Sequence, residues 1–350
     1  MQPCAQSCCW RNADTDTLRR RAIACPVNTG WIPGITCRIR LYTGKVFTSM
    51  ILVTGACGAM GSVLVRGLIA AGNKVRACVM PGDPCVSRIA DSSAELWEAD
   101  ITDSQQMQGI CNGITTVYHL AAIIITPNEW IFQSINVEGT RIVLEEAQKA
   151  HVDHFIYISS ASVTYPYPTP YSLSKRRAEA LVVASGIPYT IIRPTLVYGK
   201  IGGQEFDMYL VYLLKFPVVP FIGNGHALKQ PVHVDDIMRG LLMLPGNSVT
   251  YGKIYNFSGS EAITMRDFSR LCLTLLGKPH KPFVYLPVWL CRCIGRGMAL
   301  FMKNPPLTWQ VIAGIIQDAN LDPSEAMRDI GYKPVKVSDH IHTCFPRTHR

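Results

Sequence analysis

The sequence lacks the features that mark metal-binding and nucleic-acid-binding proteins. Its 13 cysteines include no pair in the C-x-x-C spacing of structural zinc sites, so we predict no metal centre. Charged residues make up 17% of the chain, and +5 of the net charge of +9 lies in residues 1–49. The remaining +4 is spread over residues 50–350, which argues against a nucleic-acid-binding surface.

Long apolar runs are also missing. The best candidate for a membrane span covers residues 285–302, but Arg292 and Arg296 interrupt it. These arginines are four residues apart and so share one face of a helix, whereas most apolar residues lie on other faces. We therefore expect an amphipathic helix, which either packs on the protein body or makes a peripheral membrane contact through 285–302.

Residues 1–49 differ in composition from the rest of the chain. They are rich in Cys, Arg and Thr, show no sustained helix or strand period, and contain no apolar core of a secretory signal. We expect a disordered or non-native extension with Met50 as the true start, although the arginines would also suit an organelle transit peptide. The scattered cysteines of the remainder predict a reduced, cytoplasmic protein.

The most informative pattern begins at residue 50. The apolar run 50–53 leads into Thr54-Gly55-Ala56-Cys57-Gly58-Ala59-Met60-Gly61, and an apolar-periodic helix follows. Strand, glycine turn and helix in this order place a dinucleotide pyrophosphate on a helix N-terminus. Gly55 allows the sharp turn, Gly58 leaves space for the phosphates, and Gly61 lets the helix pack closely.

Strand and helix patterns then alternate. Strands are expected at 50–54, 74–79, 94–98, 115–120, 153–159 and 188–192, and helices at 59–72, 103–111, 129–150 and 171–186. This alternation predicts an α/β fold with a Rossmann-type doubly wound parallel sheet. Beyond residue 195, prolines and glycines interrupt the alternation of strand and helix patterns. We therefore predict a dinucleotide-binding domain over 50–195 and a smaller C-terminal substrate lobe over 196–340, with segments returning to the sheet.

A second constellation joins a tyrosine, a lysine and a serine. Tyr171 and Lys175 lie four residues apart on a predicted helix, so the ammonium is expected to lower the pKa of the phenol. Ser160 follows strand 153–159 at the carboxyl edge of the sheet, where ligands bind in such folds. The pair would suit general acid/base chemistry, although a solvated helix face can show the same spacing.

These motifs make the chain resemble the extended short-chain dehydrogenase/reductases, which include nucleotide-sugar epimerases and dehydratases and 3β-hydroxysteroid dehydrogenases. The resemblance covers residues 50–334 and depends on the order of several motifs. Besides the two patterns above, these are Asp100-Ile101, His119-Leu120-Ala121-Ala122, Asn136-Val137-Glu138-Gly139-Thr140, Ser159-Ser160, Arg193-Pro194-Thr195-Leu196-Val197-Tyr198-Gly199 and His233-Val234-Asp235-Asp236.

The resemblance implies NAD or NADP as the cofactor, a small-molecule substrate and a homodimer. It makes Tyr171 the proton donor or acceptor, places Lys175 on the nicotinamide ribose, and lets Ser160 hydrogen-bond the substrate oxygen. Asn136 is expected to fix backbone rather than to react. The implied cofactor-binding residues are Tyr171, Lys175, Thr54, Gly55, Gly58, Met60, Gly61, Asp100, Ile101, Leu120, Ala121, Ala122, Pro194 and Val197.

Cofactor preference and substrate stay open. Strand 74–79 is followed by neither the acid that binds a ribose 2′-hydroxyl nor the arginine that binds a 2′-phosphate. Apolar residues at 283–290 favour a steroid- or terpenoid-like secondary alcohol. A nucleotide-sugar epimerase or dehydratase would need phosphate-binding cations, for which Lys215, Lys229 and Arg239 are candidates. A cofactor-binding assembly or structural protein without turnover is a further alternative.

Overall fold

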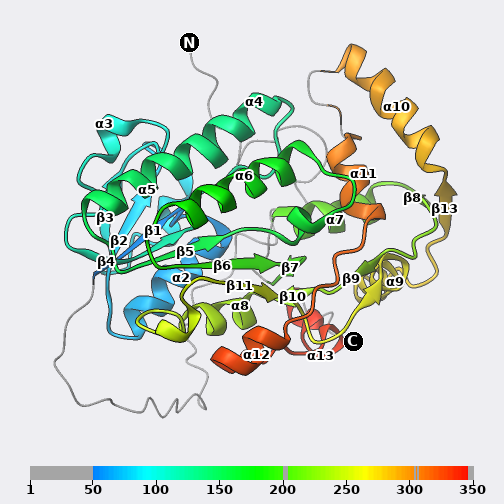
Figure 1. Cartoon of the computed structure of the whole chain (residues 1–350). Coiled ribbons are helices and arrows are strands. Elements are labelled where there is room, and N and C mark those ends of the chain that lie inside the picture. The colour runs from blue at the N-terminus through cyan, green and yellow to red at the C-terminus, as the bar shows by residue number, and fades with distance from the viewer. Residues whose placement is uncertain (1–49, 200–203, 303–304, 306, 346–350) are drawn as a thin grey trace. The chain divides into compact units, whose positions relative to one another are not determined.

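The computed structural model describes residues 50–199, 204–302, 305 and 307–345. The predictions for residues 1–49 lie outside the described residues. The centre of the described part is a seven-stranded parallel sheet in the order β11-β6-β5-β4-β1-β2-β3 (Figure 1). Its strands are β1 (Met50–Thr54), β2 (Lys74–Val79), β3 (Glu95–Glu98), β4 (Ile114–His119), β5 (His154–Ile158), β6 (Tyr189–Pro194) and β11 (Lys253–Phe257).

The strand order confirms the predicted doubly wound fold. β1 pairs with β2 on one side and with β4 on the other, so the winding direction reverses between β1 and β4. At that reversal Thr54 at the end of β1 lies opposite His119 at the end of β4. In open parallel sheets such a reversal opens the crevice in which ligands bind.

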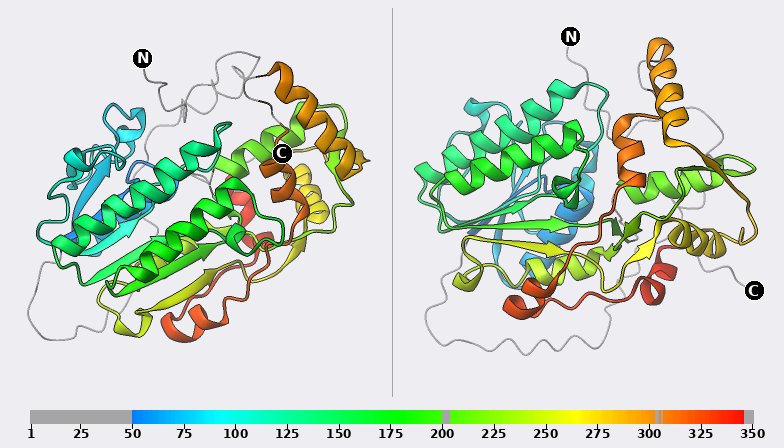
Figure 2. Two further views of the ribbon diagram at one scale, coloured as in Figure 1. Left: turned by 45° about the horizontal axis from the view of Figure 1, so that its top comes forward. Right: turned by 45° about the vertical axis from the view of Figure 1, so that its right-hand side comes forward.

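Alternating residues of the strands fill two separate cores. Ile51 and Val53 of β1 pack with α2 (Ala59–Ala70), α8 (Val234–Leu241) and α12 (Ser324–Ile330) on one face. Leu52 packs on the opposite face, with α3, α5 and α6. Figures 1 and 2 show these two helix layers on either side of the sheet. The second layer comprises α3 (Ser104–Met107), α5 (Gly139–Lys149) and α6 (Pro170–Ala184).

Three elements differ from the expectation. The helix expected over 103–111 is reduced to α3, which ends at Met107. The seventh strand, β11, was not predicted, because it is short, lies at a sheet edge and follows a long excursion from β6. The helix expected over 129–150 is divided into α4 (Glu129–Phe132), a π-helical turn η2 (Gln133–Glu138) and α5. A π-helical turn hydrogen-bonds residues that are five apart, whereas an α-helix bonds residues that are four apart. The turn therefore rotates the side chains that follow it about the helix axis.

The chain beyond β6 builds a region around a third apolar cluster that contains Phe206, Phe221 and Phe268. Whether a boundary at residue 195 separates two domains stays a prediction. No helix in the described residues has both the length and the hydropathy to cross a bilayer. The elements are β7 (Val197–Tyr198), α7 (Gln204–Lys215), β8 (Val219–Ile222), β9 (Leu228–Lys229), β10 (Val232–His233), β12 (Ile263–Thr264), α9 (Met265–Leu275), β13 (Phe283–Leu286), α10 (Val288–Phe301), α11 (Trp309–Ile316) and α13 (Val337–His340).

Candidate active site

The glycine turn connects β1 to α2, and its three glycines meet different surroundings. Gly55 has φ +66°, and a Cβ there would lie 2.8 Å from the Ala121 nitrogen. A Cβ on Gly61 would lie 2.1 Å from the Gly55 oxygen, so α2 can approach the turn only with glycine at this position. A Cβ on Gly58 would meet only the Gly55 oxygen, at 3.1 Å. Gly55 and Gly61 are therefore required by the fold, whereas Gly58 is exposed and leaves room for a ligand at the start of α2.

A chain of buried hydrogen bonds begins at the end of β1. The Thr54 hydroxyl lies 2.7 Å from His119 Nδ1, and His119 Nε2 lies 3.0 Å from the Thr140 hydroxyl. Thr140 donates to the Asn136 carbonyl oxygen at 2.7 Å, so its own oxygen must accept from Nε2–H. Burial lowers the pKa of His119 to about 3, which keeps the ring neutral. His119 is therefore a positioning residue with its proton on Nε2.

Asn136, in the π-helical turn, continues this chain to the helix that carries Tyr171. Its Oδ1 accepts from the Ile123 amide at 2.8 Å, and its Nδ2 donates to the Ile123 carbonyl at 3.0 Å and to the Ser174 hydroxyl at 2.9 Å. Ser174 in turn donates to the Tyr171 carbonyl at 2.7 Å. This geometry confirms the expectation that Asn136 fixes backbone.

Ser160 and Tyr171 meet at the carboxyl end of β5. Ser160 is the N-cap of the short helix η3 (Ala161–Thr164), and its hydroxyl accepts from the Ser162 amide at 3.1 Å. Burial raises the pKa of Tyr171, and the interaction of its hydroxyl with Ser160 partly opposes this rise. α6 begins at Pro170 with a capping box, which holds Tyr171 in the first turn. The N-cap of η3 and the capping box of α6 therefore bring the Ser160 and Tyr171 hydroxyls together.

Lys175 lies on the same helix but is not directed to the phenol. Its Nζ donates to the Ile158 carbonyl at 2.7 Å and lies 4.2 Å from the centre of the Tyr157 ring. Burial lowers the pKa of Lys175 to about 7, and Glu179 partly opposes this shift. Burial also raises the pKa of Tyr171, and Glu205 raises it further. The expectation that the ammonium lowers the tyrosine pKa is therefore wrong for this arrangement, because desolvation of the phenolate outweighs the other effects.

The other predicted cofactor residues lie at or just beyond strand ends along the same edge. Asp100 follows β3, and its Oδ1 accepts from the Thr102 amide at 2.9 Å and the Thr102 hydroxyl at 2.8 Å. Ile101 is buried against Gly139, where an added Cβ would lie 2.7 Å from Ile101 Cδ1. Met60 lies in α2, and Leu120, Ala121 and Ala122 directly follow β4. Pro194 ends β6, and Val197 begins β7. Their contact with a cofactor stays a prediction.

No sequence motif indicates a further set of contacts, which α11 and the residue just after it make. Gln317, just after this helix, donates to the Tyr167 carbonyl at 2.9 Å and accepts from the Tyr167 amide at 2.7 Å. Trp309 Nε1 donates to the Pro168 carbonyl at 3.2 Å, and the side-chain Nε2 of Gln310 donates to the Ile124 carbonyl. α11 therefore holds the loop between Ser160 and Tyr171. These contacts join residues about 150 positions apart and belong to no motif.

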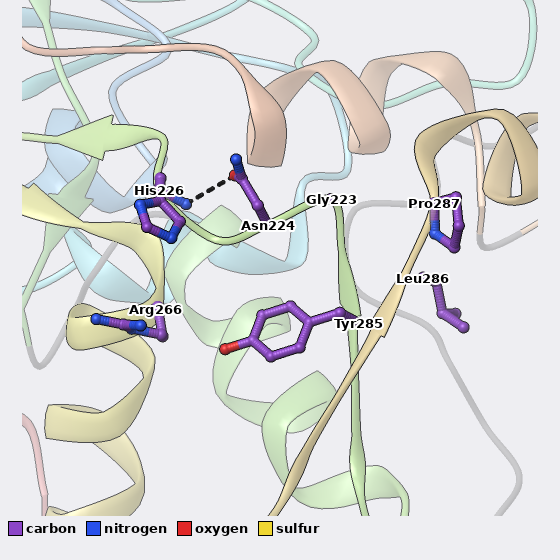
Figure 3. Close-up of a pocket in the computed structure, with 7 residues that line it drawn as sticks. All are labelled: Gly223, Asn224, His226, Arg266, Tyr285, Leu286 and Pro287. Carbon is purple, nitrogen blue, oxygen red and sulfur yellow. Dashed lines mark hydrogen bonds between the residues drawn. The ribbon is translucent and has the colours of Figure 1, made fainter.

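An open cavity of about 450 Å³ lies elsewhere, between the β8–β9 turn, α9 and β13. Figure 3 shows Tyr285 reaching toward Arg266, with His226 and Asn224 on the turn above. The Asn224 side chain accepts from the His226 amide at 3.0 Å. Ser160, Tyr171 and Lys175 are not among its lining residues, which are Gly223, Asn224, His226, Arg266, Tyr285, Leu286 and Pro287.

Comparison with known proteins finds relatives named as steroid dehydrogenases and a similar fold in a nucleotide-sugar epimerase. A 3 beta-hydroxysteroid dehydrogenase/Delta 5→4-isomerase of Mycobacterium tuberculosis is 26% identical over 339 residues, covering 85% of this chain and 89% of that protein. A 3-beta-hydroxysteroid dehydrogenase of Mycolicibacterium neoaurum is 25% identical and covers 85% of this chain and 90% of its own. The crystal structure of UDP-glucuronic acid 4-epimerase from Bacillus cereus, in complex with UDP-glucuronic acid and NAD, has a TM-score of 0.66. It is 24% identical and covers 84% of this chain and 97% of that one, which shows a shared fold.

The family comparison spans the whole predicted dinucleotide-binding region and continues to β11. Residues 51–257, more than half of the chain, match the NAD dependent epimerase/dehydratase family. The resemblance inferred from the motifs is thereby confirmed, as is the expectation of an enzyme with a nicotinamide cofactor. The chain belongs to the NAD-dependent epimerase/dehydratase family.

Proposed function

We propose that this protein is an NAD-dependent oxidoreductase that interconverts a secondary alcohol and a ketone on a steroid- or terpenoid-like substrate. The observation that carries the proposal is that the Ser160 hydroxyl, just after β5, and the Tyr171 hydroxyl, in the first turn of α6, are close enough to interact. The Tyr171 hydroxyl exchanges a proton with the substrate oxygen, and the Ser160 hydroxyl orients that oxygen by a hydrogen bond. NAD, when bound, supplies the hydride acceptor or donor.

The residues present fit such a cofactor. Gly58 leaves the N-terminal turn of α2 open, and the helix dipole favours an anionic pyrophosphate there. Lys175 lies in α6, and its Nζ, which donates to the Ile158 carbonyl, has further hydrogen-bonding capacity for a ribose hydroxyl. NAD is supported by its presence in the solved epimerase. Asp83 is the acid that follows β2 most closely in the sequence. Its side chain caps a turn by accepting from the Cys85 amide at 2.8 Å, so it does not supply the missing ribose ligand in this arrangement.

The substrate class follows from the relatives and from the positions of the cations. The two curated relatives act on hydroxysteroids by name. Lys229 donates to the Gly314 carbonyl at 2.8 Å and is buried, and Arg239 is paired with Asp236. Lys215 lies 5.6 Å from the centre of the Phe216 ring. Lys229 and Arg239 are thus engaged by other groups, whereas Lys215 is exposed, so two of the three proposed phosphate-binding cations are occupied.

The test is a panel of hydroxysteroids, terpenoid alcohols and nucleotide sugars, incubated with NAD and with NADP. Alcohol oxidation is followed by nicotinamide absorbance, and nucleotide sugars are followed by chromatography of the products, because an epimerase or dehydratase leaves no net NADH. Tyr171→Phe should lower turnover of the best substrate by about 10²–10⁴-fold, the usual contribution of proton transfer. Its NAD affinity should not change, because only the hydroxyl is removed. Tyr167→Phe is the matched control, since its ring is 65% exposed and its hydrogen bonds come from backbone.

Each other result has a defined meaning. Full activity of Tyr171→Phe would contradict the acid/base role. Turnover of nucleotide sugars alone would favour an epimerase or dehydratase, and NAD binding without turnover across the panel would favour a non-catalytic protein.

We also propose that the protein is cytoplasmic and forms a homodimer through α5 and α6. α6 exposes Leu173 and Val183, which supports contact with a second copy.

A further inference from the structure

The helix α10 presents an apolar face to solvent. Trp289, Leu300 and Phe301 are 67%, 80% and 90% exposed, which is unusual for side chains of this size. Trp289, Arg296 and Leu300 are spaced seven and four residues apart and so lie along one face of the helix, with the exposed Arg296 between the two apolar side chains. Figures 1 and 2 show α10 at the periphery, next to α11.

The opposite face of α10 fixes this orientation. Cys291 is buried in a cluster with Ile222 and Ile312. A Cβ on Gly295 would lie 2.4 Å from the Leu307 carbonyl oxygen, so the helix sits tightly on the segment before α11. The Arg292 guanidinium lies 4.7 Å from the centre of the Trp309 ring. The exposed apolar face therefore results from specific packing on the other side.

The charge of the surrounding segment has one sign. Between Asp267 and Asp318 the chain contains no acidic residue. The same stretch contains six basic residues, Arg270, Lys278, Lys281, Arg292, Arg296 and Lys303. Arg296 and Lys278 are exposed. Exposed apolar side chains with basic residues among and beside them are typical of helices that lie in the boundary between lipid headgroups and acyl chains. The stem of Arg296 can run along the apolar surface while its guanidinium reaches the headgroups.

We propose that α10, with the preceding strand β13, binds the surface of an anionic lipid bilayer, with Trp289, Leu300 and Phe301 inserted below the headgroups. The cations that border this face complement anionic lipids. The same charge opposes two other occupants, because a second copy presents the same basic segment and residues 1–49 carry a net charge of +5. With 14 residues, α10 would lie on the bilayer rather than cross it.

This surface is joined to the candidate active site through α11. α10 packs on α11, whose neighbour Gln317 and whose Trp309 hydrogen-bond the loop before Tyr171. If the proposed function holds, a steroid-like substrate dissolved in the bilayer would be delivered close to that loop. This last step rests on the proposed function, whereas membrane binding does not.

The first experiment is flotation of the full-length, NAD-loaded protein with phosphatidylcholine vesicles, with and without phosphatidylserine. The wild type should float with the phosphatidylserine vesicles and be released by salt. Trp289→Ser/Phe301→Ser should weaken binding by about 10-fold or more, because two apolar side chains no longer insert. Arg296→Gln/Lys278→Gln should weaken binding by about 10-fold on phosphatidylserine vesicles only.

Matched controls come from other parts of the surface. Met243→Ser/Val249→Ser removes two apolar side chains that are each 54% exposed. Lys333→Gln/Lys336→Gln removes two exposed lysines. Both controls should bind vesicles like the wild type. Absence of wild-type binding, or equal weakening in controls and α10 variants, would overturn the proposal.

Two further measurements separate the remaining readings. If light scattering showed that Trp289→Ser/Phe301→Ser splits a dimer without changing flotation, the face would be an interface between copies and the proposal would fail. With an active steroid, the same variant should raise KM for substrate in vesicles but not for substrate dissolved with cyclodextrin, at unchanged kcat. A loss of flotation binding without steroid turnover would support the surface and count only against the proposed function.

Discussion

Gly58 and Gly61 provide a sharp test of the cofactor site, because the same substitution should have opposite effects at positions three residues apart. At Gly61 an added Cβ would lie 2.1 Å from the Gly55 oxygen and 3.0 Å from Ala56 Cα. Both obstacles are backbone atoms, so α2 has to move by about 1 Å. Overpacking of this kind typically costs about 1–3 kcal/mol, and backbone obstacles place Gly61→Ala at the upper end.

At Gly58 the fold makes a much smaller demand. An added Cβ would meet only the Gly55 oxygen, at 3.1 Å, which a shift of a few tenths of an ångström relieves. The backbone at φ −62° and ψ 170° is accessible to alanine. The small clash and the lower entropy of the unfolded alanine chain largely cancel, so the unfolding free energy should stay within about 1 kcal/mol of the wild type. The new methyl group would instead stand where the pyrophosphate approaches.

The two variants are compared by urea denaturation followed by circular dichroism, and by calorimetric titration with NAD. Gly58→Ala should keep its stability and lose at least about tenfold in NAD affinity, which corresponds to about 1.4 kcal/mol. Gly61→Ala should lose about 3 kcal/mol of stability. Wild-type NAD affinity in Gly58→Ala would refute the phosphate-turn reasoning, and wild-type stability in Gly61→Ala would refute the packing argument.

Two further predictions concern Lys175 and the start of the chain. Burial lowers the pKa of Lys175 to about 7 from 10.5. Between these values the unfolded chain binds more protons, so stability should rise with pH, and Lys175→Met should flatten that rise in urea denaturation at about pH 7 and 9. An unchanged slope would contradict the buried ammonium. A chain beginning at Met50 should fold and bind NAD like the full chain, as judged by circular dichroism and titration, and loss of solubility would show that residues 1–49 are needed.

The sequence predicted the sheet well, because each of the first six strands is bounded by a glycine or a helix pattern. The periodicity also located α2 and α6, and with them Gly58 and Tyr171. β11 escaped because its five residues, Lys253-Ile254-Tyr255-Asn256-Phe257, show neither a continuous apolar run nor strict alternation of polar and apolar residues.

Other features of the site depend on tertiary distances that no local pattern encodes. The four-residue spacing placed Tyr171 and Lys175 on one helix but did not reveal that Ile158 binds the ammonium. The same limit applies to α11, whose contact with Tyr167 joins distant parts of the chain. The sequence thus predicted candidate acid/base residues, whereas the electrostatics of these residues required the packed structure.

The position of β11 in the sheet has a consequence for biosynthesis. β6 ends at Pro194, but its outer partner begins only at Lys253, after α7, α8 and several short strands have been made. During synthesis from the N-terminus, the outer edge of β6 therefore remains unpaired until this later segment has left the ribosome. An exposed strand edge is a template for pairing with other chains. Chains that stall or are truncated between these two strands should consequently be the ones that aggregate and need chaperones.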